Sequence, residues 1–419
     1  MRISDGRNCE KIKQLALSVV REYNKTETAG RIQKKVKGIK KLLINTVGGG
    51  AGWTGGLYYA RNIAFELLQN AYIREHYRIY ISCSRKNRKV FEDLEGQVKL
   101  ITSPVNGVIT GYMFREYVCL TRRIRYVFWA FNPGILSRTR TIAWIADFQH
   151  NRLPEFFSEK EIQERTAQFQ KTAASAAPLV LSSTAALRDF QTYYSRTKEN
   201  VYVVPFVSYI EPMIRQVRGR EDEILHRLSL DGVRYACVMN QFWQHKNHKV
   251  VFEALRILYE QYPDTNLDLV MTGEMSDYRN PEYIDTLKSY TEDPVIRNHI
   301  HILGFISRED QIAVMEKAEF VIQPSLFEGW GTVAEDAKVL DKTILLSDIP
   351  VHREQQNGKC ILFNPDDARE LAELIREESE KEHTDNPEAG IRDMYRRAES
   401  YSEGFEKLLR EAEKGKTAQ

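Results

Sequence analysis

This sequence has few cysteines, no long apolar run and little net charge. Its 419 residues include five scattered cysteines with no Cys-x-x-Cys spacing, so we expect neither a zinc site nor a disulfide framework. No apolar run approaches the roughly 18 residues of a membrane span, and the first residues do not resemble a signal peptide. The net charge of +2 gives no basic field for nucleic acid. These absences predict a protein of a reducing, cytoplasmic compartment.

The chain also lacks an Asp-x-Asp pair, so we expect no metal site of that type. What it has is length and apolar content. A chain of 419 residues with 42% hydrophobic residues exceeds what a single core usually supports. Strand-like and helix-like patterns alternate along it, which predicts two α/β domains of about 200 residues each.

The N-terminal segment is biased in charge. Residues 1–41 hold twelve Lys or Arg against four Asp or Glu. Apolar residues recur there at helical spacing (Ile12, Leu15, Ala16 and Val19), which predicts a basic amphipathic helix. Such a helix can lie on an anionic membrane surface, or it can be a solvated helix packed on the adjoining domain. The sequence leaves both interpretations open.

The most informative stretch is residues 319–354, EFVIQPSLFEGWGTVAEDAKVLDKTILLSDIPVHRE. It predicts a buried strand at 320–322, a loop at 325–332 and a helix from 333 to 340 that leads into a strand at 343–346. This is the length of a parallel crossover. Ligands of open α/β sheets bind beyond the carboxyl ends of the strands, so the loop lies where a ligand belongs. The helix that follows offers free N–H groups to an anion such as phosphate.

Glu328 stands at the tip of that loop, where its carboxylate suits the hydroxyls of a sugar or ribose. The stretch resembles the donor-site motif of the family-four retaining glycosyltransferases: Pro-Ser-x-x-Glu-Gly-x-Gly, a second Glu eight positions after the first, and Ser-Asp-Ile-Pro-x-x-x-Glu. Glu328 matches the first Glu. Asp336 occupies the second position, for which the resemblance implies a hydrogen bond to the ribose, with Glu335 as the alternative. It also implies that several loop and helix residues line the donor, namely Ser325, Gly329, Gly331, Thr332 and Val333.

The resemblance implies the GT-B fold, an α/β architecture of two Rossmann-like domains that face each other across a cleft. On that basis we expect a basic N-terminal helical extension over residues 1–40 and an acceptor-side domain over 41–206. A nucleotide-sugar-binding domain would span 207–399, and residues 400–419 would cross back onto the first domain.

A glycine-rich segment, residues 48–56, follows the strand predicted at 41–45. Its spacing is not Gly-x-Gly-x-x-Gly, and no acidic residue lies about twenty positions on at the end of a second strand, where the sequence is Ile79-Tyr80-Ile81-Ser82-Cys83, so a dinucleotide site is a poor fit. Similar Gly-Gly loops in the family face the donor diphosphate and the acceptor. The resemblance therefore implies that Gly55 and Gly56 contribute to the donor site.

Residues 147–155, Asp-Phe-Gln-His-Asn-Arg-Leu-Pro-Glu, follow another predicted strand. They resemble the Asp-x-x-His-x-x-x-Pro-Glu loop of one branch of these transferases. Many relatives carry a histidine directly after the strand, where this chain has Ala146. The nearest histidine is His150, which we predict lies in the cleft beside the reacting sugar. A lone loop histidine is more often an ordinary structural residue, and that alternative remains.

The loop at 240–248 follows the strand predicted at 235–239. Relatives place an Arg near its start and a Lys five residues later, and both hold the donor diphosphate. Lys246 matches the Lys, while Gln241 stands at the Arg position. A cation at the carboxyl end of a strand suits phosphate, although a solvated loop lysine is the ordinary alternative.

Three further features lie downstream. In relatives the backbone at Gly304, Phe305 and Ile306 contacts the nucleobase. Ser307 is predicted to cap a helix over 308–318, and Asn364 is predicted to cap another.

The resemblance predicts a cytoplasmic, metal-independent retaining glycosyltransferase of the hexosyltransferase type, with Glu328, His150 and Lys246 as its catalytic residues. It would need no cofactor and would transfer sugar from a UDP- or GDP-sugar to a glycan or lipid-linked acceptor, in cell-surface polysaccharide assembly. Peripheral contact with an anionic membrane is also expected. The alternatives are a nucleotide-sugar epimerase of the same fold and a carbohydrate-binding protein that has lost catalysis.

Overall fold

The computed structural model describes residues 38–47, 54–104, 108–128 and 139–415. Most of the predicted N-terminal helical extension and the glycines at 48–52 lie outside these residues. The described chain divides after Trp144 into two compact units. No helix in its described part is long and apolar enough to cross a membrane.

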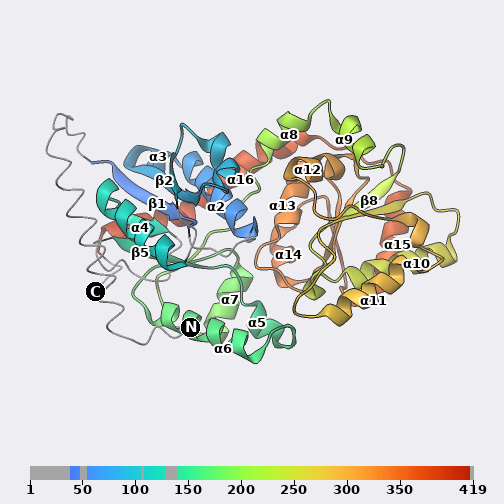
Figure 1. The fold of residues 1–419 in the computed structure, drawn as a ribbon, viewed down its shortest axis with the longest axis horizontal. Coiled ribbons are helices and arrows are strands. Elements are labelled where there is room, and N and C mark those ends of the chain that lie inside the picture. Colours follow the sequence, from blue (N-terminus) through green and yellow to red (C-terminus); the bar gives the residue numbers. More distant parts are fainter. Residues whose placement is uncertain (1–37, 48–53, 105–107, 129–138, 416–419) are drawn as a thin grey trace. The chain divides into compact units, whose positions relative to one another are not determined.

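The strands form two sheets, and the described strand pairs are parallel (Figure 1). One sheet has the order β3-β2-β1-β4-β5-β6-β7, and the other β10-β9-β8-β11-β12-β13. The strands of the first sheet are β1 Lys40–Asn45, β2 Tyr77–Ser84, β3 Lys99–Ser103, β4 Tyr126–Phe128, β5 Arg140–Ile145, β6 Leu179–Leu181 and β7 Val201–Val203. Those of the second are β8 Tyr235–Met239, β9 Asp268–Thr272, β10 Ile300–Ile302, β11 Val321–Gln323, β12 Ile344–Ser347 and β13 Cys360–Phe363.

Helices connect these strands in the alternation that parallel sheets require. They are α2 Thr54–Gln69, α3 Ala71–His76, α4 Val108–Arg122, α5 Gln149–Arg152, α6 Glu159–Ala174, α7 Thr184–Tyr193, α8 Glu211–Val217 and α9 Glu221–Arg227, followed by α10 His248–Gln261, α11 Pro281–Thr291, α12 Arg308–Lys317, α13 Thr332–Val339, α14 Pro350–Gln355, α15 Ala368–Ser379 and α16 Pro387–Glu413. Short 3₁₀ turns occur at Arg88–Leu94, Pro154–Phe156, Gln244–Lys246 and Arg297–His299. The two parallel α/β sheets agree with the predicted fold class, and the domain boundary at 206 stays a prediction.

Helix starts follow local capping chemistry. The Ser307 side chain accepts a hydrogen bond from the Asp310 N–H, as predicted for the start of α12. The prediction that Asn364 caps a helix is wrong. Its side chain accepts from the N–H of Asp366 in a local turn, and Asp367 caps α15 instead. An Asn can close such a turn on its own, so the helix starts three residues later than expected.

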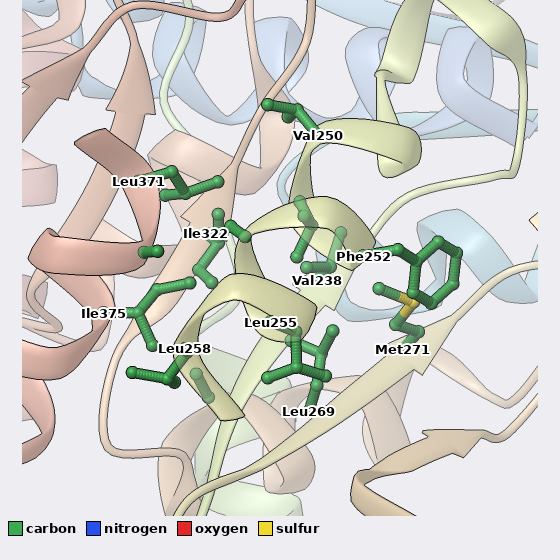
Figure 2. Packing of buried hydrophobic residues seen from close by; sticks show 14 of the residues in the cluster. Val238, Val250, Phe252, Leu255, Leu258, Leu269, Met271, Ile322, Leu371 and Ile375 are labelled. Carbon is green, nitrogen blue, oxygen red and sulfur yellow. The ribbon is translucent and has the colours of Figure 1, made fainter. Parts of the chain in front are cut away.

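The core of the second sheet explains its stability and its rigidity. Figure 2 shows α10 beside α15, with Leu258 next to Ile375 and Leu255 next to Leu269. Val238 of β8 and Ile322 of β11 are both fully buried in this cluster. Buried apolar side chains of this size each contribute about 1.5–3 kcal/mol relative to exposure. The strand ends are therefore fixed, and the loops beyond them start from defined positions.

Strand order places one edge of this sheet where a ligand belongs. β8 and β11 are neighbours, and the order runs outward from them in both directions. That is a topological switch point, where the connections on either side diverge and leave a crevice beyond the carboxyl ends. The loops at 240–247 and 324–331 both leave the sheet there.

Candidate functional site

Lys246 and Glu328 meet at this switch point although 82 residues separate them. The Lys246 ammonium donates to Oε1 of Glu328 over 2.6 Å, and both side chains keep partial exposure (17% and 11%). An ammonium has three N–H donors, so Lys246 can serve Glu328 and a further anion together. The structure thus brings together the two residues for which the sequence predicted separate ligand contacts.

Three donors hold the Glu328 carboxylate in place. Besides Lys246, the Gln323 amide (2.8 Å) and the Ser325 hydroxyl (2.7 Å) donate to the same Oε1. Burial alone would raise the pKa of Glu328, but Lys246, together with His245 and His352, outweighs it and the pKa is lowered. An ionised carboxylate with one oxygen fixed is well oriented to accept hydrogen bonds from ligand hydroxyls.

Two glycines, Gly329 and Gly331, lie in the loop at 325–332, here called the donor loop, and their surroundings differ. A Cβ on Gly329 would lie 2.3 Å from the Ala146 carbonyl oxygen, so the backbones approach too closely for any side chain. Gly331 is held by Gln355, whose amide accepts from its N–H (3.2 Å) and donates to its carbonyl (3.0 Å). The N–H groups of Thr332 and Val333 follow in the first turn of α13, where a helix has no internal acceptors for them.

A cavity of about 280 Å³ lies beside Glu328 within the second unit. Its walls come from the loop after β5, the start of α7, the donor loop and the start of α14. Polar groups on these walls include Asp147, Arg152, Arg188 and Asp189. Arg152 and Asp189 form an ion pair, which leaves the cavity with a balanced mixture of charge and apolar surface of the kind that small-molecule sites show.

The two carboxylates considered for ribose both lie on α13 and are both buried. Asp336 accepts from Arg308 at the start of α12, while its other oxygen, Oδ2, is buried without a hydrogen bond. Glu335 instead contacts Lys338 and Arg397, on the side of α13 that packs against α16. Of the two, Asp336 faces the loop that follows β10.

His150 is not among the residues that line the cavity. Its ring is 1% exposed and packs against Phe157 and Phe169, with Nε2 2.9 Å from the Tyr194 hydroxyl. Burial lowers its pKa to about 4, so the imidazole is neutral near pH 7. This position does not suit direct contact with a sugar. Asp147, three residues earlier, lines the cavity instead.

The other residues of the second sheet that were predicted to contact the nucleotide-sugar are Gln241, Gly304, Phe305 and Ile306. They lie in loops that meet at one edge of the sheet. The Gln241 side chain accepts from the Glu274 N–H, which ties the loop after β8 to the loop after β9. Gly304 adopts a left-handed conformation (φ +67°) and its carbonyl accepts from Gly273 N–H. Phe305 is 70% exposed, and Ile306 is half-buried beside it. Their predicted contacts with a nucleobase stay predictions.

Gly55 and Gly56 belong to the first turn of α2, in the first unit. Their role in the donor site also stays a prediction.

Sequence reasoning missed two residues of the site. Gln323, whose amide donates to Glu328, is a polar residue at the end of a buried strand. A buried polar side chain needs a hydrogen-bond partner, so this position could have been recognised from the sequence. Arg308, the partner of Asp336, follows a cap residue and looks like an ordinary first-turn residue, so no local signal marked it. Within the described residues, no group of three or more His, Cys, Asp and Glu side chains could hold a metal ion.

Comparison with known proteins finds one matching family and several similar structures. Residues 221–411 match the model of the family described as glycosyl transferases group 1. A segment of 142 residues is 23% identical to the O-antigen chain mannosyltransferase RfbU of Salmonella typhimurium, covering 34% of this chain and 37% of that protein. The chain therefore matches little more than a third of that relative's length.

Solved structures share the fold over nearly the whole chain. The Anabaena Alr3699/HepE structure in complex with UDP and glucose covers 90% of this chain and 100% of its own, with a TM-score of 0.59 and 15% identity. WaaG, a glycosyltransferase involved in lipopolysaccharide biosynthesis, covers 86% of this chain and 95% of its own, with a TM-score of 0.57 and 14% identity. The chain has the GT-B fold, and its residues 221–411, a little under half of the chain, match the family described as glycosyl transferases group 1.

Proposed function

We propose that this protein is a retaining glycosyltransferase that moves a hexose from a nucleotide-sugar to a glycan or lipid-linked acceptor in cell-surface polysaccharide assembly. The observation that carries the proposal is the Lys246–Glu328 pair at the switch point of the second sheet. A cation for the diphosphate and an oriented carboxylate for the sugar hydroxyls are the two groups that such a donor needs side by side.

The charge that develops on the leaving nucleoside diphosphate sets the main electrostatic requirement. As the bond between the anomeric carbon and the phosphate oxygen breaks, negative charge grows on that oxygen. Lys246 and the N–H groups at the start of α13 supply fixed positive charge to stabilise it. Glu328 holds the sugar, and Asp336 is the proposed ribose contact. The acceptor hydroxyl adds to the anomeric carbon on the face the diphosphate leaves, and its proton goes to the departing phosphate.

Mannose is the sugar to test first, because the curated relative is named as a mannosyltransferase. Purified protein would be incubated with labelled GDP-mannose, UDP-glucose and other UDP- and GDP-sugars, each with a polysaccharide or lipid-linked acceptor fraction. Label moving to the acceptor with retained anomeric configuration supports the proposal. Epimerised donor without transfer would indicate an epimerase, and donor binding without turnover would indicate a carbohydrate-binding protein.

The proposed reaction uses Lys246 and a helix terminus where other transferases use a divalent ion. We therefore expect transfer to persist in EDTA. Complete loss in EDTA, restored by Mg²⁺ or Mn²⁺, would contradict this account. The proposed compartment is the cytoplasm, at the inner face of the membrane when the acceptor is lipid-linked.

A further inference from the structure

Exposed aromatic side chains gather at the carboxyl edge of the second sheet. Trp243 follows β8, Tyr278 follows β9 and Phe305 follows β10, and these three strands are neighbours. Tyr278 and Phe305 are 71% and 70% exposed, the two highest values among the large hydrophobic side chains that the structure describes, and Trp243 is 36% exposed. Phe305 has a predicted contact with the nucleobase, whereas Tyr278 and Trp243 have no part in the proposed reaction. Aromatic surface that clusters beside a site differs from the single apolar side chains of an ordinary surface.

The Tyr278 ring is held in place by Arg279. The guanidinium carbon lies 5.0 Å from the centre of the Tyr278 ring, and it also lies over Phe157 (4.4 Å) and Trp243 (5.9 Å). Cation–π contacts of this kind attract the ring and the guanidinium to each other. A side chain that is already ordered loses little further entropy when a ligand binds. Tyr278 therefore offers a preformed surface on which the flat face of a ligand can stack.

Asp277 joins the two loops that carry Trp243 and Tyr278. Its carboxylate accepts from the N–H groups of Gln244 and Arg279, each over 3.0 Å. The Asn280 amide, one residue further on, donates to Oε1 of Gln244 over 2.6 Å. These hydrogen bonds fix the loop after β8 against the loop after β9, so the aromatic side chains on them keep their positions.

A small pocket of about 60 Å³ opens beside Arg279, lined by these two loops and by the turn at Pro154–Phe156. Arg279 donates through Nε to Glu161 over 3.4 Å, and its two Nη groups form no hydrogen bond with any residue that the structure describes. They keep their N–H donors for a ligand, although the side chain is only 14% exposed. The pocket has room for a group of a few heavy atoms and not for a whole sugar ring.

The charges of the pocket favour a neutral ligand. Two carboxylates, Glu155 and Asp277, line it together with one guanidinium. Burial lowers the pKa of His245, which also lines it, to about 3, so this ring carries no charge near pH 7. A phosphate would meet a net negative charge there. Sugar hydroxyls both donate and accept hydrogen bonds, so they match a wall of carboxylate, amide and guanidinium groups.

The pocket lies next to the donor loop. His245 directly precedes Lys246 in sequence, and its carbonyl accepts from the Leu326 N–H over 2.8 Å. An apolar surface with a few placed polar groups is the usual composition of a small-molecule site. A sugar bound there would be close to the proposed transfer centre and separate from the sugar that Glu328 holds.

We propose that Tyr278, Trp243 and the pocket at Arg279 form a saccharide subsite for a pyranose ring of a glycan acceptor. One face of the ring would stack on Tyr278, and hydroxyls at the edge of the ring would enter the pocket. The assignment of the ligand as an acceptor rests on the proposed transferase function. It implies that the acceptor has at least two sugar units, one at the transfer centre and one on Tyr278.

The first test is kinetic and uses the polysaccharide acceptor fraction. Tyr278→Ala should raise the KM for this acceptor about five- to tenfold, with kcat and the donor KM within about twofold of wild type. Tyr278→Phe keeps the ring and should restore the wild-type acceptor KM. Because Tyr278 is largely exposed, both variants should fold, and thermal unfolding checks this.

Tyr262→Ala is the matched control. Tyr262 is also an exposed tyrosine with an arginine, Arg376, over its ring (5.3 Å), but it follows the last turn of α10, whereas the loop after β8 leads into the first. Its removal should change neither KM. An unchanged acceptor KM in Tyr278→Ala would overturn the proposal. So would a loss of nucleoside diphosphate affinity in that variant, measured by calorimetry, because it would place the nucleobase on Tyr278.

A binding measurement separates this proposal from the proposed function. The fluorescence of Trp243, taken as the difference between wild type and Trp243→Phe, should change saturably when the polysaccharide fraction is added without any donor. Tyr278→Ala should need about five- to tenfold more of the fraction for the same change. If wild type transfers no sugar but gives this signal, the saccharide subsite stands and the transferase function falls. Absence of the signal overturns the subsite whether or not transfer occurs.

Discussion

Glu328 and Glu335 lie seven residues apart and have opposite surroundings. Both sit beside a lysine, and both have a pKa that burial would raise but neighbouring cations lower. Glu328 stands on a loop beyond a strand end and lines a cavity. Glu335 stands in the first turn of the next helix and is fully buried against α16, with Lys338 and Arg397. The same chemistry serves a ligand in one place and the packing of two helices in the other.

The largest expected effect concerns Glu335, the carboxylate that contributes to the packing of α13 against α16. Glu335→Ala leaves the buried Lys338 without its carboxylate partner and Arg397 with Asp393 alone, which should lower the free energy of unfolding by about 3–5 kcal/mol. Chemical denaturation measures it. Glu377→Ala, an exposed change on α15, should stay within about 0.5 kcal/mol of wild type. A loss below about 1 kcal/mol for Glu335→Ala would show that the pair network does not stabilise the fold.

The second expectation separates the two sites by pH, because the Glu328 side includes buried histidines, His245 and His352. Burial lowers the His352 pKa from its usual value near 6.5 to about 4. The unfolded chain therefore binds the proton more readily, and stability present above pH 6.5 is lost as pH falls toward 4. The shift corresponds to about 3 kcal/mol at most.

The measurement is the pH dependence of unfolding in wild type and His352→Gln. Between pH 7 and pH 4.5 the variant should lose less stability than wild type. Parallel curves for the two proteins would mean that His352 does not carry this linkage.

The third expectation concerns the ligand side. Glu328→Gln keeps the volume and an oxygen for Ser325 and Lys246, but removes the charge that holds sugar hydroxyls. Transfer should fall about 100-fold, equivalent to about 2.7 kcal/mol, with a melting temperature close to wild type. Sugar-transfer kinetics and a thermal scan check both parts. Activity above a tenth of wild type would remove Glu328 from the proposed machinery.

The smallest expected effect is on nucleotide binding and tests the role of Lys246. Lys246→Ala should weaken nucleoside diphosphate binding by about 1.5–3 kcal/mol and leave binding of the bare nucleoside unchanged. Lys249→Ala, an exposed neighbour on α10, is the matched control and should change neither. Calorimetry distinguishes the outcomes: equal losses for nucleoside and diphosphate would mean that Lys246 supports the loop rather than the phosphate.

The local sequence pattern was enough to predict most of the fold. The apolar runs that predicted β8, β11 and β12 are the buried strands of the second sheet, and the crossover through α13 has the predicted order. β13 was not predicted, because Cys360–Phe363 is short and only partly buried. The start of α15 was misplaced because Asn364 closes its own turn.

Side-chain direction was harder to predict than the elements. Histidines are common catalytic residues. In α5, however, the His150 side chain points toward Phe169 and Tyr194 rather than toward the cavity. Asp336 and Glu335 are adjacent in sequence, and the helix rotates them by about 100° relative to each other. Which of them faces α16 depends on where the last helix packs, and no local pattern encodes that contact.

The sequence by itself determined the two parallel sheets, the glycine-bracketed loop and the residues Lys246 and Glu328 as candidates, because strand and turn preferences act over a few residues. Only the tertiary structure decided that these two side chains share one hydrogen bond, and that Gln323 and Gln355 hold the loop. Those facts depend on strand order and register, which are set by burial of the whole sheet.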